Sequence, residues 1–186
     1  MTSYVAFLRG INVGGHRKIK MADLRLALEA SGLQQVQTYI QSGNVVFVSD
    51  LEATVLHQQI EQVIEETFGF AVQVVLRTAS QLNTILRDCP FSEEMIAKAV
   101  ASAVGECLYV AMLGETPTQE KIEQLRGYQS EQEKFAICEQ NIYLLFYQSV
   151  RNAKLARQIE KLGVTVTVRN WKTMNKLNTM AVKIVD

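Results

Sequence analysis

Two polar segments of the chain carry residue types that bind anions. The first is Arg-Gly-Ile-Asn-Val-Gly-Gly at residues 9–15, and the second is Thr-Val-Arg-Asn-Trp-Lys-Thr at residues 167–173. Each follows an apolar run that we expect to form a strand, so each would lie where the chain leaves a sheet. Arginine forks and exposed backbone N–H groups at such places typically bind phosphate or carboxylate groups. Both segments are therefore candidate anion-binding sites.

The first segment continues into a basic, glycine-rich loop. From Arg9 to Lys20 the chain has three glycines and no acid. Gly14-Gly15 would let the backbone adopt positive φ angles and form a nest of N–H groups for an anion. The spacing is neither G-x-G-x-x-G nor G-x-x-x-x-G-K-[ST], so neither dinucleotide nor Walker-type binding is indicated. The alternative is a flexible basic loop in which the glycines serve only chain geometry.

Gln-Ser-Gly-Asn at residues 41–44 lies between two expected strands. The simplest interpretation is a hairpin turn, and the functional one has Ser42 and Asn44 presenting polar groups at the end of the sheet. Ser42 lacks the G-x-S-x-G surroundings of a nucleophilic serine. Nothing places His16, the only candidate base, near it. We therefore assign no catalytic residue.

The second segment combines a guanidinium, an amide and the only tryptophan of the chain. The guanidinium of Arg169 would bind a phosphate, and the ring of Trp171 would stack on a base or another ring. Alternatively, Asn170 only caps the last helix and Trp171 packs into a seam between domains. Lys172 and Lys176 would share one face near the start of that helix. Positive charge there opposes the helix dipole, which indicates either an anionic partner or solvated surface lysines.

These considerations give one set of candidate ligand-binding residues, drawn from the two segments, the basic loop and the turn between them. They are Arg9, Asn12, Gly14, Gly15, Lys18, Ser42, Asn44, Arg169, Asn170, Trp171 and Lys172.

Composition limits the class of protein. Hydrophobic residues make up 48% and charged residues 20%, as in an ordinary soluble globular protein. No apolar run approaches the roughly 18 residues that a membrane span needs, and we expect no signal peptide because the first residues run directly into a strand. The three cysteines are odd in number and far apart, which favours free thiols in a reducing cytoplasm. No cluster has metal-ligand spacing, so we expect no metal and no cofactor.

The formal net charge is zero, but it is unevenly distributed. Residues 1–20 and 149–186 together carry +10, and residues 21–148 carry −10. Such asymmetry can mark a surface that binds a partner, although it can also be scatter over exposed faces. It is notable here because the basic ends also contain the two polar segments.

The periodicity of apolar residues predicts the element order β-α-β-β-α-β in the first part of the chain, the ferredoxin-like split pattern. Helices end at Gly32 and Gly69. The expected strands cover residues 4–8, 36–40, 45–48 and 72–76.

The same order is predicted again after a helical connector. The second set of strands covers residues 107–113, 134–138, 142–147 and 164–168, and a final helix follows with Asn170 as its N-cap. We therefore expect an α+β protein with two packed ferredoxin-like halves and antiparallel sheets. The expected ranges are 1–78 for the first half, 79–105 for the connector and 106–186 for the second half with the C-terminal helix.

The chain resembles a bacterial family of uncharacterised proteins, domain of unknown function 1697. The resemblance rests on the motifs at residues 8–15, 21–24, 38–47 and 169–173. Two departures are visible. Cys89 stands where the family often has Asn before Pro-Phe, and Val168 and Lys172 stand where the family often has Ala and Asn in the last motif. The resemblance implies a compact α+β fold with paired ferredoxin-like halves and implies no activity.

We therefore expect a cytoplasmic protein that binds a phosphorylated ligand, a nucleotide or a nucleic-acid strand, in a basic cleft. This requires both polar segments to face one cleft. One alternative is a transferase or hydrolase that acts on a phosphorylated metabolite, with Arg9, Lys18 and Arg169 stabilising developing charge. Another is a homodimeric interaction module without a ligand. The neutral total charge argues against strong nucleic-acid binding, for which an isoelectric point above about 9 is usual.

Overall fold

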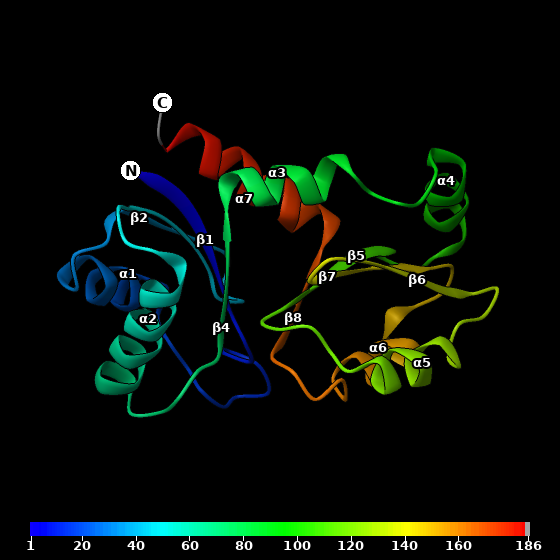
Figure 1. Cartoon of the computed structure of the whole chain (residues 1–186), viewed down its shortest axis with the longest axis horizontal. Helices are drawn as coiled ribbons and strands as arrows, with labels where there is room; N and C mark the ends of the chain where they lie inside the picture. The colour runs from blue at the N-terminus through cyan, green and yellow to red at the C-terminus, as the bar shows by residue number, and fades with distance from the viewer. Residues whose placement is uncertain (185–186) are drawn as a thin grey trace. The chain divides into compact units, whose positions relative to one another are not determined.

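The structure is a computed structural model that describes residues 1–184, and its elements follow the β-α-β-β-α-β order twice (Figure 1). The elements of the first part are β1 (Thr2–Leu8), α1 (Met21–Ala30), β2 (Gln34–Tyr39), β3 (Asn44–Ser49), α2 (Ala53–Phe68), β4 (Val74–Thr78), α3 (Ala79–Arg87) and α4 (Glu93–Ser102). Those of the second part are β5 (Leu108–Leu113), α5 (Gln119–Arg126), β6 (Glu133–Cys138), β7 (Asn141–Phe146), a 3-10 turn (Val150–Asn152), α6 (Lys154–Ile159), β8 (Val166–Asn170) and α7 (Trp171–Lys183).

The strands form two four-stranded sheets of identical topology. Their strand orders are β2-β3-β1-β4 and β6-β7-β5-β8, and all neighbouring strands are antiparallel. This confirms the expected α+β class with two antiparallel sheets. The first strand of each set lies in the interior of its sheet, so the loop that follows β1 starts from a buried element.

The first sheet is buried on both faces. On one face Ala6 and Leu8 pack with α1 and α2, whose apolar stripes are inserted into the same core. Val5 and Phe7 point to the opposite face and are equally buried. Ser3 lies on that second face, and its hydroxyl donates to the carbonyl of Ala181 in α7 at 2.8 Å. The C-terminal part of α7 therefore covers the face that α1 and α2 leave open.

The second sheet has the same two-faced burial. Ala111 and Leu113 of β5 pack with α5 and α6 on one face. Tyr143 of β7 points to the other face, where its hydroxyl donates to the carbonyl of Ile85 in α3 at 2.8 Å. The last turn of α3 thus lies against this sheet.

The described residues divide into two compact units, Met1–Thr84 with the described residues from Asn175 onward, and Ile85–Met174. The boundaries lie within α3 and α7, which differs from the expected ranges 1–78, 79–105 and 106–186. The second half of α7 belongs to the first unit because its residues cover the sheet face that carries Ser3. The apolar spacing of a helix does not specify which sheet it covers, so the sequence could not distinguish the two assignments.

The same backbone hydrogen bond occurs within each unit. The N–H of Leu8, at the end of β1, donates to the carbonyl of Gly43 at 2.8 Å. At the same place in the second unit, the N–H of Leu113 donates to the carbonyl of Gln140 at 2.9 Å. In both units the turn before the third strand is therefore hydrogen-bonded to the end of the first strand. In the first unit the basic loop begins directly after this hydrogen bond, at the end of β1.

Candidate functional site

A groove of about 590 Å³ lies beside the basic loop of the first unit. Its walls come from that loop, the first turn of α1, the turn before β3 and the last residue of α2. Three of the predicted ligand-binding residues line it, together with five residues outside that set. The lining residues are Asn12, Gly15, Lys18, Ile19, Lys20, Asp23, Gln41 and Phe68.

Asn12 holds this loop in shape. Its side-chain Oδ1 accepts a hydrogen bond from the N–H of Ile19 at 2.9 Å, and its Nδ2 donates to the carbonyl of Ile19 at 3.0 Å. The same Nδ2 donates to the carbonyl of Gln41 at 2.8 Å. Asn12 also has a φ of 55°, a left-handed conformation that asparagine adopts more readily than most residues. The predicted ligand-binding amide therefore positions the groove wall, and its polar atoms already bond within the chain.

The tip of the loop turns back at Gly14-Gly15. Both residues have positive φ angles, 62° and 80°, and the N–H of His16 donates to the carbonyl of Val13 at 3.3 Å. Nothing lies within 4 Å of a Cβ built at either glycine, so their role is the backbone conformation and not close packing. The turn returns the chain to Lys18, Ile19 and α1.

Positive charge at the groove comes from Lys18 and Lys20, whose side chains are exposed. Lys20 is also the N-cap residue of α1, and its side chain makes no capping hydrogen bond. The first N–H groups of a helix lack partners inside the helix and carry the positive end of its dipole. Asp23, in the first turn of α1, contributes one carboxylate to the same wall. Two lysines and a helix N-terminus therefore meet at this groove.

Phe68 gives the groove an apolar wall. It is the last residue of α2 and packs, partly buried, against the core beneath the sheet. Phe68 continues the helical spacing of the buried residues Leu56, Ile60 and Ile64 along α2. Its position at the helix end, just before Gly69, was the available signal that one side of the ring could face outward.

The turn before β3 is built from residues that were predicted to bind a ligand. Asn44 is fully buried and its Nδ2 donates to the carbonyl of Tyr39 at 3.0 Å and to Ser42 Oγ at 3.0 Å. These bonds support the plain hairpin-turn interpretation for Ser42 and Asn44. Gln41, which was not selected from the sequence, is the residue of this turn that lines the groove.

Gly43 explains how closely the turn approaches β1. Its φ is 81°, and a Cβ at this position would lie 2.7 Å from Leu8 Cβ and 3.0 Å from Ile11 Cδ1. Only glycine fits here without displacing the start of the basic loop. The close approach places Gln41 within reach of Asn12.

Arg9 follows β1 directly but does not line the groove. Its Nη1 donates to Gln73 Oε1 at 2.9 Å, and its backbone N–H donates to the carbonyl of the same residue at 2.9 Å. Arg9 thus bonds to the segment that precedes β4.

The second polar segment begins inside a strand. Arg169 lies in β8 opposite Val110, whereas we expected it where the chain leaves the sheet. Its Nη1 donates to Thr167 Oγ1 at 2.8 Å and to the carbonyl of Val168 at 2.9 Å. Burial lowers the pKa of Arg169 to about 10, so the guanidinium is still charged at neutral pH.

An arginine occupies the equivalent place in the first unit. Arg77 is the fourth residue of β4, as Arg169 is of β8, and its Nη1 donates to the carbonyl of the preceding Leu76 at 2.8 Å. Arg77 is buried with 7% exposure. The repetition indicates that this position has a structural role in both sheets.

Asn170 caps α7, because its Oδ1 accepts a hydrogen bond from the N–H of Thr173 at 2.8 Å. This supports the capping interpretation made from the sequence. Trp171, the first residue of α7, is half-buried and Lys172 is exposed. The cleft shared by the two polar segments stays a prediction.

Among residues 1–184, no group of three or more His, Cys, Asp or Glu side chains is placed to hold a metal ion. Within the same residues, no helix has the length and apolar character that crossing a membrane requires.

Comparisons with known proteins identify a family and a fold. A family model described as a protein of unknown function (DUF1697) matches residues 1–143. A conserved bacterial protein from Streptococcus pneumoniae has a similar solved structure, with a TM-score of 0.75 and 24% sequence identity over 97% of this chain and 98% of that one. At this identity the likeness shows the fold alone. None of the curated proteins matches the chain.

Proposed function

The chain belongs to the DUF1697 family of proteins of unknown function, and we propose that it binds a small phosphorylated ligand in the groove beside the basic loop. The observation that carries this proposal is the meeting of Lys18, Lys20 and the N-terminus of α1 at one hollow. Phosphate groups bind at helix N-termini because backbone N–H groups and the helix dipole both favour negative charge there. The two lysines supply the formal charge that the backbone lacks.

The dimensions of the groove favour a nucleotide or a molecule of similar size. Small-molecule sites typically enclose roughly 300–1,000 Å³, and this groove measures about 590 Å³. Phe68 provides an apolar surface on which a base or another planar ring would lie, while the phosphate would face Lys18 and Lys20. A nucleic-acid strand is the less favoured ligand because the chain has no net charge.

The lining favours binding over a reaction. Its side chains are two lysines, two amides, two apolar groups and one carboxylate, Asp23. Asn12, one of the amides, already bonds to the backbone of Ile19 and Gln41. A binding function uses the two lysines and the apolar wall without requiring a proton donor and acceptor pair. We place this function in a reducing cytoplasm, in keeping with three free cysteines.

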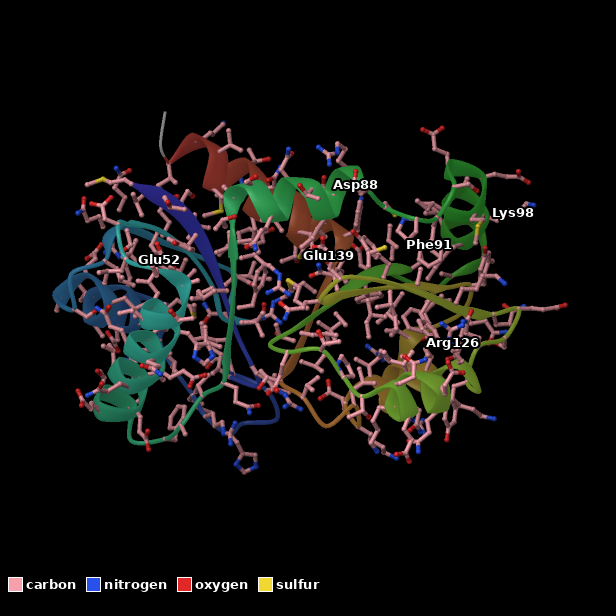
Figure 2. All side chains as sticks on the ribbon, viewed as in Figure 1. Glu52, Asp88, Phe91, Lys98, Arg126 and Glu139 are labelled. Atoms are coloured by element: carbon pink, nitrogen blue, oxygen red, sulfur yellow. The ribbon has the colours of Figure 1, made fainter. Side chains whose placement is uncertain are left out.

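A thermal-shift panel of nucleoside mono-, di- and triphosphates, sugar phosphates and inorganic phosphate tests the proposal. A ligand at a hundredfold excess over Kd stabilises the folded protein by roughly 2.7 kcal/mol. We expect stabilisation of the wild type and its loss in Lys18→Gln and Lys20→Gln. Lys98→Gln is the matched control, because Lys98 is exposed and pairs with Glu94 on α4 (Figure 2). No shift with any phosphate compound, or equal shifts in all three variants, would contradict the proposal.

A further inference from the structure

Cys138 and Tyr143 lie on the same face of the second sheet. Tyr143 is paired with Ala136 across β6 and β7, and residues directly opposite in an antiparallel pair point to the same face. Cys138 is two residues further along β6 than Ala136, so its side chain points the same way. The intervening Ile137 packs into the core on the opposite face. The Cys138 thiol therefore lies on the face that carries the Tyr143 ring.

The last turn of α3 lies over this same face, and Cys89 follows it closely in the chain. Tyr143 Oη donates to the carbonyl of Ile85 at 2.8 Å, which fixes the end of α3 against the sheet. The helix ends at Arg87, and Cys89 follows in the irregular segment before α4. Only three residues lie between it and Ile85. Cys89 and Cys138 are both half-buried, so neither thiol is sealed inside the core.

The electrostatics of the cluster agree with this placement. Burial raises the pKa of the Cys89 thiol, and the neighbouring Cys138 raises it further. The pKa of Tyr143 is also raised, chiefly by burial and then by the nearby Cys138 and Cys89. Figure 2 labels Asp88 and Glu139, the chain neighbours of the two cysteines, and both carboxylates also raise the pKa of Tyr143. The side chains of Cys89, Cys138 and Tyr143 therefore form a single cluster.

We propose that Cys89 and Cys138 form a reversible disulfide when the protein meets a peroxide or a small-molecule disulfide. With hydrogen peroxide, one thiolate attacks a peroxide oxygen and becomes a sulfenic acid, and the other oxygen leaves as water after protonation. The second thiol then attacks the sulfenic sulfur, the S–S bond forms and a second water leaves. The two thiols lose two electrons and two protons, and the peroxide gains them. The bond would tie the segment between α3 and α4 to the end of β6.

Alkylation and mass spectrometry of the intact chain test this. The folded protein is treated with hydrogen peroxide, then unfolded and alkylated with iodoacetamide. We expect a mass lower by two hydrogen atoms before alkylation, a single alkylated cysteine afterwards, and a cross-linked peptide pair that contains Cys89 and Cys138. Dithiothreitol should restore three alkylated cysteines.

Three serine variants serve as matched controls, each checked by circular dichroism for a native spectrum. Cys107→Ser should still form the bond, because Cys107 is buried with 5% exposure and lies directly before β5, outside the proposed pair. Cys89→Ser and Cys138→Ser should each lose it. A disulfide that contains Cys107, oxidation to sulfinic acid without a cross-link, or three alkylated cysteines after peroxide treatment would each overturn the proposal.

Discussion

At the scale of single residues, the groove depends on groups that bond within the chain. The Asn12 carboxamide bonds to both backbone groups of Ile19 and to the carbonyl of Gln41, so one side chain holds two other residues of the wall. Gly43 allows the turn before β3 to lie against Leu8 and Ile11. The ligand-facing charges, Lys18 and Lys20, are by contrast exposed. The sequence shows that a residue is polar, but it does not show whether that residue holds the groove in shape or faces the ligand.

Gly43→Ala tests the close approach. Gly69 has nearly the same φ, 79° against 81°, but nothing lies within 4 Å of a Cβ there. Gly69→Ala should cost about 1 kcal/mol for the left-handed backbone alone. Gly43→Ala should cost a further 1–3 kcal/mol, roughly the penalty for overpacking, because the new methyl group meets Leu8. Urea unfolding measures both, and equal losses of unfolding free energy would refute the packing argument.

Tyr143 gives a pH-dependent contribution to stability. Its pKa is raised in the folded protein, chiefly by burial, while in the unfolded chain it is near 10.0. Above pH 10 the unfolded state therefore binds fewer protons than the folded state, so the free energy of unfolding falls as pH rises. Below pH 10 the hydrogen bond to Ile85 contributes its full value, about 1 kcal/mol.

The comparison with Tyr143→Phe isolates this group. We expect the wild type to be the more stable protein at pH 8, and the difference in unfolding free energy between the two proteins to shrink between pH 9 and pH 11. Urea unfolding across this range checks it. A difference that stays constant or grows with pH would mean that Tyr143 is not held protonated by burial.

At the scale of elements, apolar periodicity specified the order and number of strands in each sheet but not their ends. The last strands were expected at residues 72–76 and 164–168, and both are found two residues later. Val72 is buried in the core although it precedes β4, so burial and strand pairing do not begin at the same residue. Because β8 ends at Asn170 and not at residue 168, Arg169 lies inside the strand and not after it. Apolar spacing reports burial, whereas strand limits depend on hydrogen bonds to a partner that the sequence does not identify.

The cap of α7 is one element boundary that could be predicted, because Asn170 has a local partner three residues on. Asn170→Ala should lower the free energy of unfolding by about 1 kcal/mol, since the N–H of Thr173 loses its acceptor. Asn170→Asp should keep most of the stability, because a carboxylate accepts the same bond and favours the helix dipole. Thermal unfolding of the two variants checks this. Equal destabilisation by both would show that the side chain of Asn170 acts elsewhere.

At the scale of the whole molecule, two units repeat one topology, and both α3 and α7 cross the boundary between them. Five of the eight residues that line the groove were not selected from the sequence, because they come from the end of the basic loop, the first turn of α1, the turn before β3 and the end of α2. These five are Ile19, Lys20, Asp23, Gln41 and Phe68. The chain's charge distribution did indicate the basic loop. Only folding brings the end of α2 and the start of α1 to the same hollow.

Trp171 reports on the prediction that the two polar segments share one cleft. It is the only tryptophan of the chain, so all tryptophan fluorescence comes from α7. If the segments share a cleft, a nucleotide that stabilises the protein should also change this emission, and Lys18→Gln should abolish the change. Binding that leaves the emission unaltered would place the ligand away from Trp171 and contradict the shared cleft.

The most direct test of the groove itself is isothermal titration of the best phosphorylated ligand from the panel into four proteins: the wild type, Lys18→Gln, Lys20→Gln and Lys98→Gln. Each lysine that contacts the phosphate contributes a charge-assisted interaction, so we expect Kd to rise by about tenfold or more in Lys18→Gln and Lys20→Gln. Lys98→Gln should bind as the wild type does. Wild-type affinity in both groove variants would contradict the assignment of this groove as the phosphate site.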